Sequence, residues 1–374
     1  MRSVGVEEEL LLVDARSGEP LALSGALLEA ADRFVERQPD GGGESQGHTF
    51  EKELQEEQLE FATKPVTEMG ELLKEITRWR GEAARHAASA GALVAALGTS
   101  PLPVQPSLSA GKRYEWVGEQ FGLTAQEQLT CGCHIHVSVD SDEEGVAVLD
   151  RIRPWLPVLT AMSANSPFWQ GEDSGYASYR SRVWNRLPSA GPTDLFGSAD
   201  RYHEQVRAML DTGVLRDKGM MYFDARLSAA YPTVEVRVAD VCLDASTPVL
   251  LAALVRGLVE TASRAWQDGQ PPARINTGLL RLAAWRAGRS GLDGPLIDPR
   301  TMRETSPAVA VEALHAHVRE ALADHGDDER VREGITRLLE HGNGARVQRA
   351  LLRTEGTLGG MTTRCAEITT GARA

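Results

Sequence analysis

Carboxylates recur at alternate positions in a strand-like stretch near the start of the chain. Residues 4–13 are mostly β-branched and aliphatic and contain Glu7, Glu8 and Glu9. Because side chains alternate between the two faces of a strand, Glu7 and Glu9 point one way and Glu8 points the other. Charge runs usually face water, so a frayed strand end is the ordinary interpretation. A carboxylate pair that binds a cation is the functional one.

Three further stretches, 49–63, 130–139 and 233–241, alternate charged or imidazole side chains with apolar ones. The side chains that share one face of their strand are Glu60, His134, His136, Glu235 and Arg237. Each stretch by itself also fits an exposed strand, where a cross-strand ion pair is worth only about 0–1 kcal/mol. Together the four stretches predict one sheet with helices behind it and this charged set on its other face.

Cations are needed to hold such a cluster together. Two carboxylates ~4 Å apart repel by roughly 4 kcal/mol at an effective dielectric constant near 20. Hard oxygen ligands with an imidazole suit Mg²⁺ or Mn²⁺. A multi-metal cluster with an arginine at its edge suits ATP, because metals bridge phosphate oxygens and the arginine stabilises the transferred group.

A zinc site is the alternative for Cys131-Gly132-Cys133-His134-Ile135-His136. On a regular strand the cysteines face away from the histidines, and no other cysteine pair has ligand spacing. A metal-dependent hydrolase that uses His134 and His136 stays open as a second possibility.

Composition and charge narrow the class of protein. The 374 residues carry a formal net charge of −13 at pH 7, which disfavours nucleic acid or an anionic membrane as a partner. The four cysteines do not form a secreted disulfide framework. No signal peptide and no apolar run of about 18 residues is found, so a cytoplasmic protein is expected.

The pattern of elements favours an α+β fold with an antiparallel or mixed sheet, because strands come singly or in pairs. Helices are expected at 23–37, 68–90, 145–162 (bent at Pro154 and Pro157) and 247–267, and strands at 92–98 and 221–229. Residues 165–192 are expected to form a functional loop. We expect one domain over residues 1–374, mainly helical after about residue 275.

Several ordered motifs resemble those of the YbdK-type carboxylate–amine ligases, also called glutamate–cysteine ligase type 2. The motifs are Gly5-Val6-Glu7-Glu8-Glu9, Gln58-Leu59-Glu60, Cys131-Gly132-Cys133-His134-Ile135-His136, Thr233-Val234-Glu235-Val236-Arg237 and the late Gly342-Asn343-Gly344. The resemblance covers essentially the full length. It implies a glutamine-synthetase-like fold, with an antiparallel sheet curved into an active-site funnel and helices on its outer face.

The resemblance also implies roles for particular residues. The metal-binding positions would be Glu7, Glu9, Glu53, Glu60, His134 and Glu235. Arg237 would reach the transferring phosphoryl group, Arg226 would bind ATP with it, and Arg180 would hold a substrate carboxylate. Arg237, Glu235 and Arg180 are the expected catalytic residues. Seven residues separate Glu53 from Glu60, so a turn or bulge must bring Glu53 back to the same face. Glu8 is expected on the packing side or at the rim, with Glu8→Gln tolerated far better than changes at Glu7 or Glu9.

The resemblance implies an enzyme that uses ATP and Mg²⁺ (or Mn²⁺) to activate a carboxylate, with the γ-carboxylate of glutamate expected, and joins it to an amine. The expected partners are ATP and amino acid substrates, and a homodimer is expected. Alternatives are a phosphotransferase or guanidino kinase on the same fold, the hydrolase, and a binding protein without catalysis. No pattern in the sequence identifies the acceptor amine.

Overall fold

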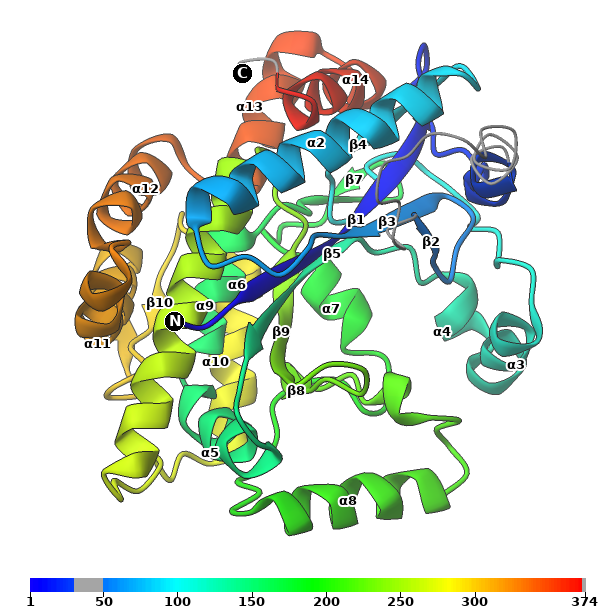
Figure 1. Ribbon diagram of the computed structural model, residues 1–374. Helices are drawn as coiled ribbons and strands as arrows, with labels where there is room; N and C mark the ends of the chain where they lie inside the picture. Colours follow the sequence, from blue (N-terminus) through cyan, green and yellow to red (C-terminus); the bar gives the residue numbers. More distant parts are fainter. Residues whose placement is uncertain (30–49, 372–374) are drawn as a thin grey trace, which may run out of the picture.

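The computed structural model of the protein describes residues 1–29 and 50–371, and its centre is an antiparallel sheet (Figure 1). The strands are β1 Val4–Asp14, β2 Glu51–Lys52, β3 Gln58–Ala62, β4 Ala92–Ala95, β5 Gly132–Ser138, β8 Ala225–Leu227 and β9 Thr233–Asp240. They lie in the order β2-β3-β1-β5-β9-β8, with β4 paired to the far end of β1, and each pairing is antiparallel. The expected α+β class is confirmed.

The register places the predicted charged residues opposite one another. Glu9 lies opposite Glu60 on β3, and Glu7 lies opposite His134 on β5. His136 in turn lies opposite Glu235 on β9. Because opposite residues of neighbouring strands share a face, the four stretches contribute to one continuous polar surface.

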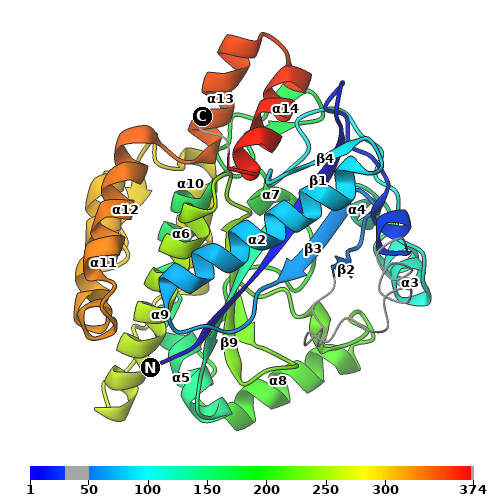
Figure 2. The ribbon, with the colours of Figure 1, turned by 45° about the horizontal axis from the view of Figure 1, so that its top comes forward.

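Apolar side chains of the same strands form the packing face. Val6, Ile135 and Val236 are each 1% exposed and belong to one core with the long helix α9. The helices that cover this part of the molecule are α2 Met69–Ala88, α5 Asp142–Ile152, α6 Leu156–Ser163 and α9 Ser246–Gln267. Figure 2 shows α2 crossing over β1, β3 and β4. The sheet therefore has one helical face and one polar face.

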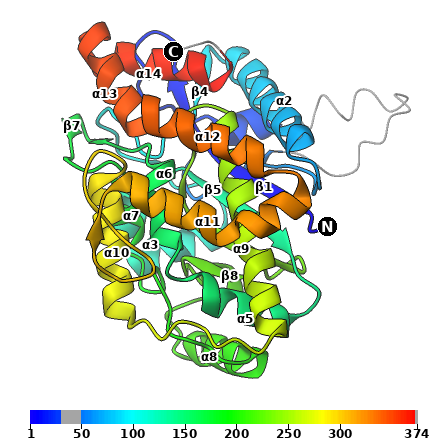
Figure 3. The same cartoon turned by 90° about the vertical axis from the view of Figure 1, so that its left-hand side faces the viewer.

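The chain after residue 275 adds an outer layer. Its helices are α10 Thr277–Ser290, α11 Pro307–His325, α12 Asp328–His341, α13 Gly344–Glu355 and α14 Leu358–Thr369. Helices α11 and α12 pack against α9, and α14 packs against β4 (Figure 3). The short hairpin of β10 Leu296–Ile297 and β11 Glu304–Thr305 is an exception to the expected helix and turn.

Smaller elements complete the fold and refine the expected boundaries. They are α3 Lys112–Phe121, α4 Leu123–Gln126, α7 Arg180–Trp184, α8 Ala199–Asp211 and the hairpin β6 Phe168–Trp169 with β7 Glu172–Asp173. The expected loop at 165–192 thus contains this hairpin and α7. The expected strand at 221–229 is much shorter, because a 3₁₀ turn at Lys218–Met220 precedes it and only Ala225–Leu227 pair.

Three of the predicted helices can be compared in detail. The prediction at 68–90 is confirmed by α2, and the bend predicted at Pro154 and Pro157 separates α5 from α6. In the first predicted helix, residues 24–29 are helical, and the remainder lies outside the described residues. None of the described helices is long and apolar enough to cross a membrane.

Candidate active site

Three groups of possible metal ligands form a row across the polar face of the sheet. They are Glu7/His136/Glu235, Glu7/Glu60/His134 and Glu9/Glu53/Glu60, and within each group one ligand atom per residue lies within 4.8 Å of the others. Neighbouring groups share Glu7 or Glu60, so the row is continuous from β9 to β3. The residues predicted at these positions are thus brought together.

Both imidazoles are oriented around Glu7. His134 Nδ1 lies 3.2 Å from Glu7 Oε2, and His136 Nε2 lies 3.2 Å from Glu7 Oε1. The opposite nitrogen of His136 is 2.9 Å from Thr233 Oγ1. His134 Nε2 is buried without a hydrogen-bond partner, 4.0 Å from Glu9 Oε1. An orphaned ring nitrogen facing carboxylate oxygens is suited to bind a cation.

The carboxyl groups at the β3 end of the row repel one another strongly. Burial and the neighbouring Glu53 raise the pKa of Glu9 to about 8. The same two causes raise the pKa of Glu60 well above its usual range. Without a cation this end therefore tends to hold protons, and a divalent cation would replace them. The all-oxygen donor set fits Mg²⁺ or Mn²⁺.

The β9 end of the row is neutralised by two arginines. Arg226 Nε lies 2.7 Å from Glu235 Oε2, and Arg237 Nη1 forms an ion pair with Glu235 Oε1. Burial would raise the pKa of Glu235, but Arg237 and Arg226 outweigh it and lower that pKa to about 2. Glu235 is therefore ionised, as a metal ligand must be.

A bulge in β9 sets the place of Arg237. Cys133 lies opposite Ala239 whereas Ile135 lies opposite Val236, so two residues of β9 face His134 alone. The amide of Arg237 donates to Asp224 O at 2.9 Å, which fixes the backbone at this point. The side chains of Arg237 and Arg226 line one cavity beside the row. The resemblance implied that both arginines belong to the site.

The row borders a cavity of about 410 Å³ that extends from β2 and β3 to Arg237 on β9 and Arg226 on β8. Besides the acids, its lining includes Arg113, Tyr114, Trp184, Leu187, Tyr222, Arg226 and Arg237. This volume lies in the range of small-molecule sites. Aromatic and basic walls opposite a row of carboxylates can hold a small substrate against bound cations.

Of the remaining predicted residues, Glu53 joins the row of possible metal ligands, whereas Arg180 lies outside the main cavity. The chain turns between β2 and β3, as predicted, and this turn brings Glu53 to Glu9 and Glu60. Arg180 is 2% exposed, lies 4.0 Å from Asp240 Oδ1 and packs closely against Gly132. It does not line the main cavity but a smaller adjoining one, with Arg182 and Asp224. Its contact with a substrate carboxylate stays a prediction.

Several residues of the site were not predicted. His136, which groups with Glu7 and Glu235, was not among the predicted metal-binding positions, although its place on the same face as His134 was a signal that could have included it. Tyr114 lies on α3, Trp184 on α7 and Tyr222 before β8. No strand pattern in the sequence connects these segments to the site, because loop packing positions them.

The cysteines lie outside the row of ligands. Cys133 belongs to the apolar core, and burial raises its pKa well above the usual range. Cys131 is 1% exposed, and its Sγ atom lies 3.7 Å from Gln58 Nε2. Among the described residues no cysteine joins a group of metal ligands, so the zinc alternative of the sequence is not supported.

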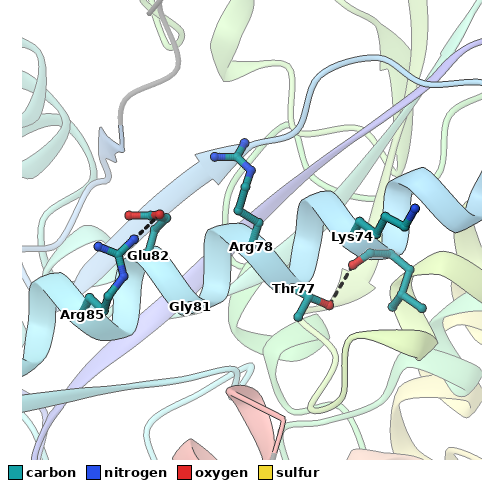
Figure 4. A pocket seen from close by; sticks show the side chains of 7 residues that line it. Lys74, Thr77, Arg78, Gly81, Glu82 and Arg85 are labelled. Carbon is teal, nitrogen blue, oxygen red and sulfur yellow. Dashed lines mark hydrogen bonds and ion pairs between the residues drawn. The ribbon is translucent and has the colours of Figure 1, made fainter. Parts of the chain in front are cut away.

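A second hollow lies over the outer face of α2 (Figure 4). Its lining includes an exposed ion pair of Glu82 with Arg85 and the hydroxyl of Thr77, which donates to Leu73 O at 2.8 Å. These are ordinary contacts of a solvated helix and contain no cluster of acids. The candidate site is therefore the row on the sheet.

The sequence is similar to those of known proteins over nearly its whole length. Residues 3–367 match the family described as glutamate-cysteine ligase family 2. The chain is 61% identical over 372 residues to a Streptomyces coelicolor protein provisionally named glutamate–cysteine ligase 2, with 100% of both chains covered. A Streptomyces avermitilis protein with a similar provisional name is 60% identical over 371 residues, covering 99% of this chain and 100% of its own.

Two solved structures are similar in fold at low sequence identity. One is a bifunctional glutathione synthetase from Pasteurella multocida, with a TM-score of 0.70 and 15% identity. The match covers 99% of this chain and 52% of the synthetase chain. The other is a glutamate–cysteine ligase from Francisella tularensis in complex with AMP, with a TM-score of 0.64 and 14% identity. The match covers 100% of this chain and 89% of that ligase chain. The chain belongs to glutamate-cysteine ligase family 2.

Proposed function

We propose that the protein is an ATP-dependent ligase that joins a carboxylate to an amine. The observation that carries this proposal is the row of three ligand groups with Arg237 beside it. A single cation site would suit many hydrolases, whereas several sites in a row suit a triphosphate. Membership of the glutamate–cysteine ligase family supports the same activity.

Mg²⁺ or Mn²⁺ would be held by Glu7, Glu9, Glu53, Glu60, His134, His136 and Glu235, and would neutralise the triphosphate when bound. The carboxylate substrate attacks the γ-phosphorus, so that an O–P bond forms and the bond to ADP breaks. The amine then attacks the acyl carbon, the C–O bond breaks and phosphate leaves, while the nitrogen loses a proton. Arg237 stabilises the charge that develops on the transferred phosphoryl group. Arg226 holds the Glu235 carboxylate in place beside Arg237.

The substrate carboxylate is proposed to be the γ-carboxylate of glutamate. The cavity of about 410 Å³ is of the size needed for an amino acid beside the cations. Arg180 is proposed to hold a second carboxylate of the substrate. We infer that ATP and amino acids are the partners, that nucleic acid and membranes are not, and that the protein works in the cytoplasm as a homodimer.

Stimulated ADP release tests the proposed reaction. With ATP and Mg²⁺, ADP and free phosphate are expected only when a carboxylate such as glutamate and an amine are both present, and mass spectrometry should detect the condensed product. A phosphorylated product that persists would identify a phosphotransferase instead. Turnover without ATP would favour the hydrolase, and no stimulation by any amino acid pair would contradict the ligase.

Cation binding is expected to stabilise the fold. A ligand that binds only the folded state adds about 3 kcal/mol at 100 times its dissociation constant. The melting temperature should therefore rise when Mg²⁺ is added after treatment with EDTA. Glu60→Gln is expected to lose most of this rise, because Glu60 belongs to two of the three groups.

The same variant has a second expected property. Since folding raises the pKa of Glu60, its ionised form destabilises the folded state at pH values above the ordinary pKa. In EDTA near neutral pH, Glu60→Gln should thus melt no lower than the wild-type protein. A variant that melts lower in EDTA yet keeps the full response to Mg²⁺ would refute the assignment of Glu60.

A further inference from the structure

We propose that Trp184 is a positioning residue that fixes the separation between Arg180 and Arg237. Its ring would thereby set the distance between the arginine that anchors the substrate and the arginine at the transferred phosphoryl group. This inference rests on the proposed function, because it uses the roles proposed there for the two arginines. It adds a residue that belongs to none of the groups of metal ligands.

The ring of Trp184 lies beside the guanidinium groups of two arginines from different elements. The guanidinium carbon of Arg180 is 5.4 Å from the ring centroid, and that of Arg237 is 5.7 Å from it. Arg180 begins α7 and Trp184 ends it four residues later, so their side chains share a face of the helix. Arg237 comes from β9, against which α7 packs (Figure 1). A cation within about 6 Å of an aromatic centroid is attracted by the face of the ring.

Arg180 is a buried cation whose other contacts are weak. Its Nη1 lies 4.0 Å from Asp240 Oδ1, and its Nη2 donates a long hydrogen bond of 3.5 Å to Arg237 O. Its Nε is buried without a hydrogen-bond partner. Asp240 also accepts hydrogen bonds from the hydroxyl groups of Ser166 and Ser178, so its charge is shared. A buried charge is costly without a close partner, and the guanidinium is therefore suited to take a carboxylate of the substrate.

Arg237 is fixed by an ion pair at only one of its nitrogens. Its Nη1 pairs with Glu235, whereas its Nε is buried without a hydrogen-bond partner. One ion pair holds one corner of a guanidinium but leaves its plane free to turn. The ring of Trp184 supplies the second contact, which fixes the direction in which the group faces.

The indole ring is itself held in place and lies between the two proposed binding groups. Its centroid is 5.0 Å from that of Tyr222 at an interplanar angle of 70°, an edge-to-face arrangement that aromatic pairs favour. Trp184 and Arg237 line both the main cavity and the smaller one that Arg180 lines. A ring held by a helix and by a second ring requires little ordering when substrate binds, so it can act as a rigid spacer.

Steady-state kinetics of Trp184→Leu tests the spacer, because leucine fills space but has no aromatic face. The assay uses ATP, Mg²⁺, glutamate and the amine that stimulates ADP release most. The KM for glutamate should rise about 10-fold and kcat should fall about 10-fold, as expected for the loss of a desolvated cation–π contact at each arginine. The KM for ATP should change less than about 3-fold, since the cations hold the triphosphate. Trp184→Phe keeps an aromatic face and should restore most of both losses.

A matched control and a double variant make the result specific. Trp285 on α10 is 38% exposed, and its ring centroid is 5.9 Å from the guanidinium carbon of Arg286. Trp285→Leu should therefore leave every constant unchanged. Arg180→Met alone should raise the KM for glutamate, and adding Trp184→Leu should raise it little further, because the group that Trp184 holds is then absent.

Folding is checked separately from kinetics. Trp184→Leu should keep the rise in melting temperature on addition of Mg²⁺, because none of the possible metal ligands is changed. If this variant does not fold, Trp184→Met tests the same point, since its flexible side chain fills irregular gaps.

Three results would overturn the role of Trp184. The first is a folded Trp184→Leu protein with the KM and kcat of the wild-type protein. The second is an equal rise in the KM for glutamate and for ATP. The third is full additivity of Trp184→Leu and Arg180→Met in the KM for glutamate. A wild-type protein that releases no ADP with glutamate and any amine would instead refute the proposed function, and this inference with it.

Discussion

Glu235→Ala is expected to lower carboxylate-dependent ADP release by about 10³-fold, the cost of removing a major charge-stabilising group from an active site. Glu235 belongs to one ligand group with Glu7 and His136. It also lies between Arg226 and Arg237 and neutralises them. Its loss removes a ligand and leaves two uncompensated positive charges beside the row, so the cation is both less tightly held and repelled.

The turnover of Glu235→Ala should be measured alongside its circular dichroism, because the side chain is buried and its loss affects folding. Glu320→Ala, at a 90% exposed side chain on α11, is the matched control and should keep full activity. Glu235→Gln preserves the shape but not the charge, and should fail nearly as severely as Ala. A folded Glu235→Ala protein with more than about a tenth of normal turnover would contradict the assignment of Glu235.

Glu8→Gln is expected to destabilise the protein by about 3–5 kcal/mol, the usual cost of breaking a buried ion pair. Glu8 is fully buried on the packing side of β1, and both of its oxygens lie 2.8 Å from Arg80 nitrogens. Arg80, 1% exposed, also donates to Cys242 O at 2.6 Å and to Leu243 O at 2.9 Å. The pair therefore joins β1 to α2 and to the segment that follows β9.

Denaturation by urea measures this loss, and a double-mutant cycle tests its origin. The double variant Glu8→Leu/Arg80→Met should be more stable than Arg80→Met alone, since no unpaired charge then remains in the core. If Glu8→Gln unfolds at the wild-type urea concentration, the ion pair contributes little.

The buried pair alters what was expected of Glu8 from the sequence. The sequence predicted Glu8 either on the packing side of the strand or at the rim. Glu8 lies on the packing side, since it has no exposed surface. Glu8→Gln is therefore expected to keep its turnover when folded but to lower the free energy of unfolding. Glu9→Gln should show the reverse, because it removes one of several buried carboxylates that repel one another and also a proposed ligand.

The alternation of side chains was sufficient to predict the polar face. In a strand the direction of a side chain depends only on its position, so Glu7 and Glu9 could be assigned to one face and Glu8 to the other from local sequence. The same alternation placed Arg237 beside Glu235, and the resemblance added Arg226 as a neighbour of the row. These assignments rest on geometry and motifs within a few residues, which the linear sequence contains in full.

Contacts between distant segments were decided only by the tertiary structure. The pairing of Glu8 with Arg80 depends on how α2 crosses the sheet, and the place of Glu53 depends on the turn before β3. The position of Trp184 beside the cavity depends on how α7 packs against β9, and that of Tyr231 beside His136 depends on the turn between β8 and β9. Side-chain direction is a local property of the backbone, whereas register, helix crossing and loop packing come from burial of the whole chain. The sequence therefore determined which side chains share the polar face, and the fold determined their surroundings.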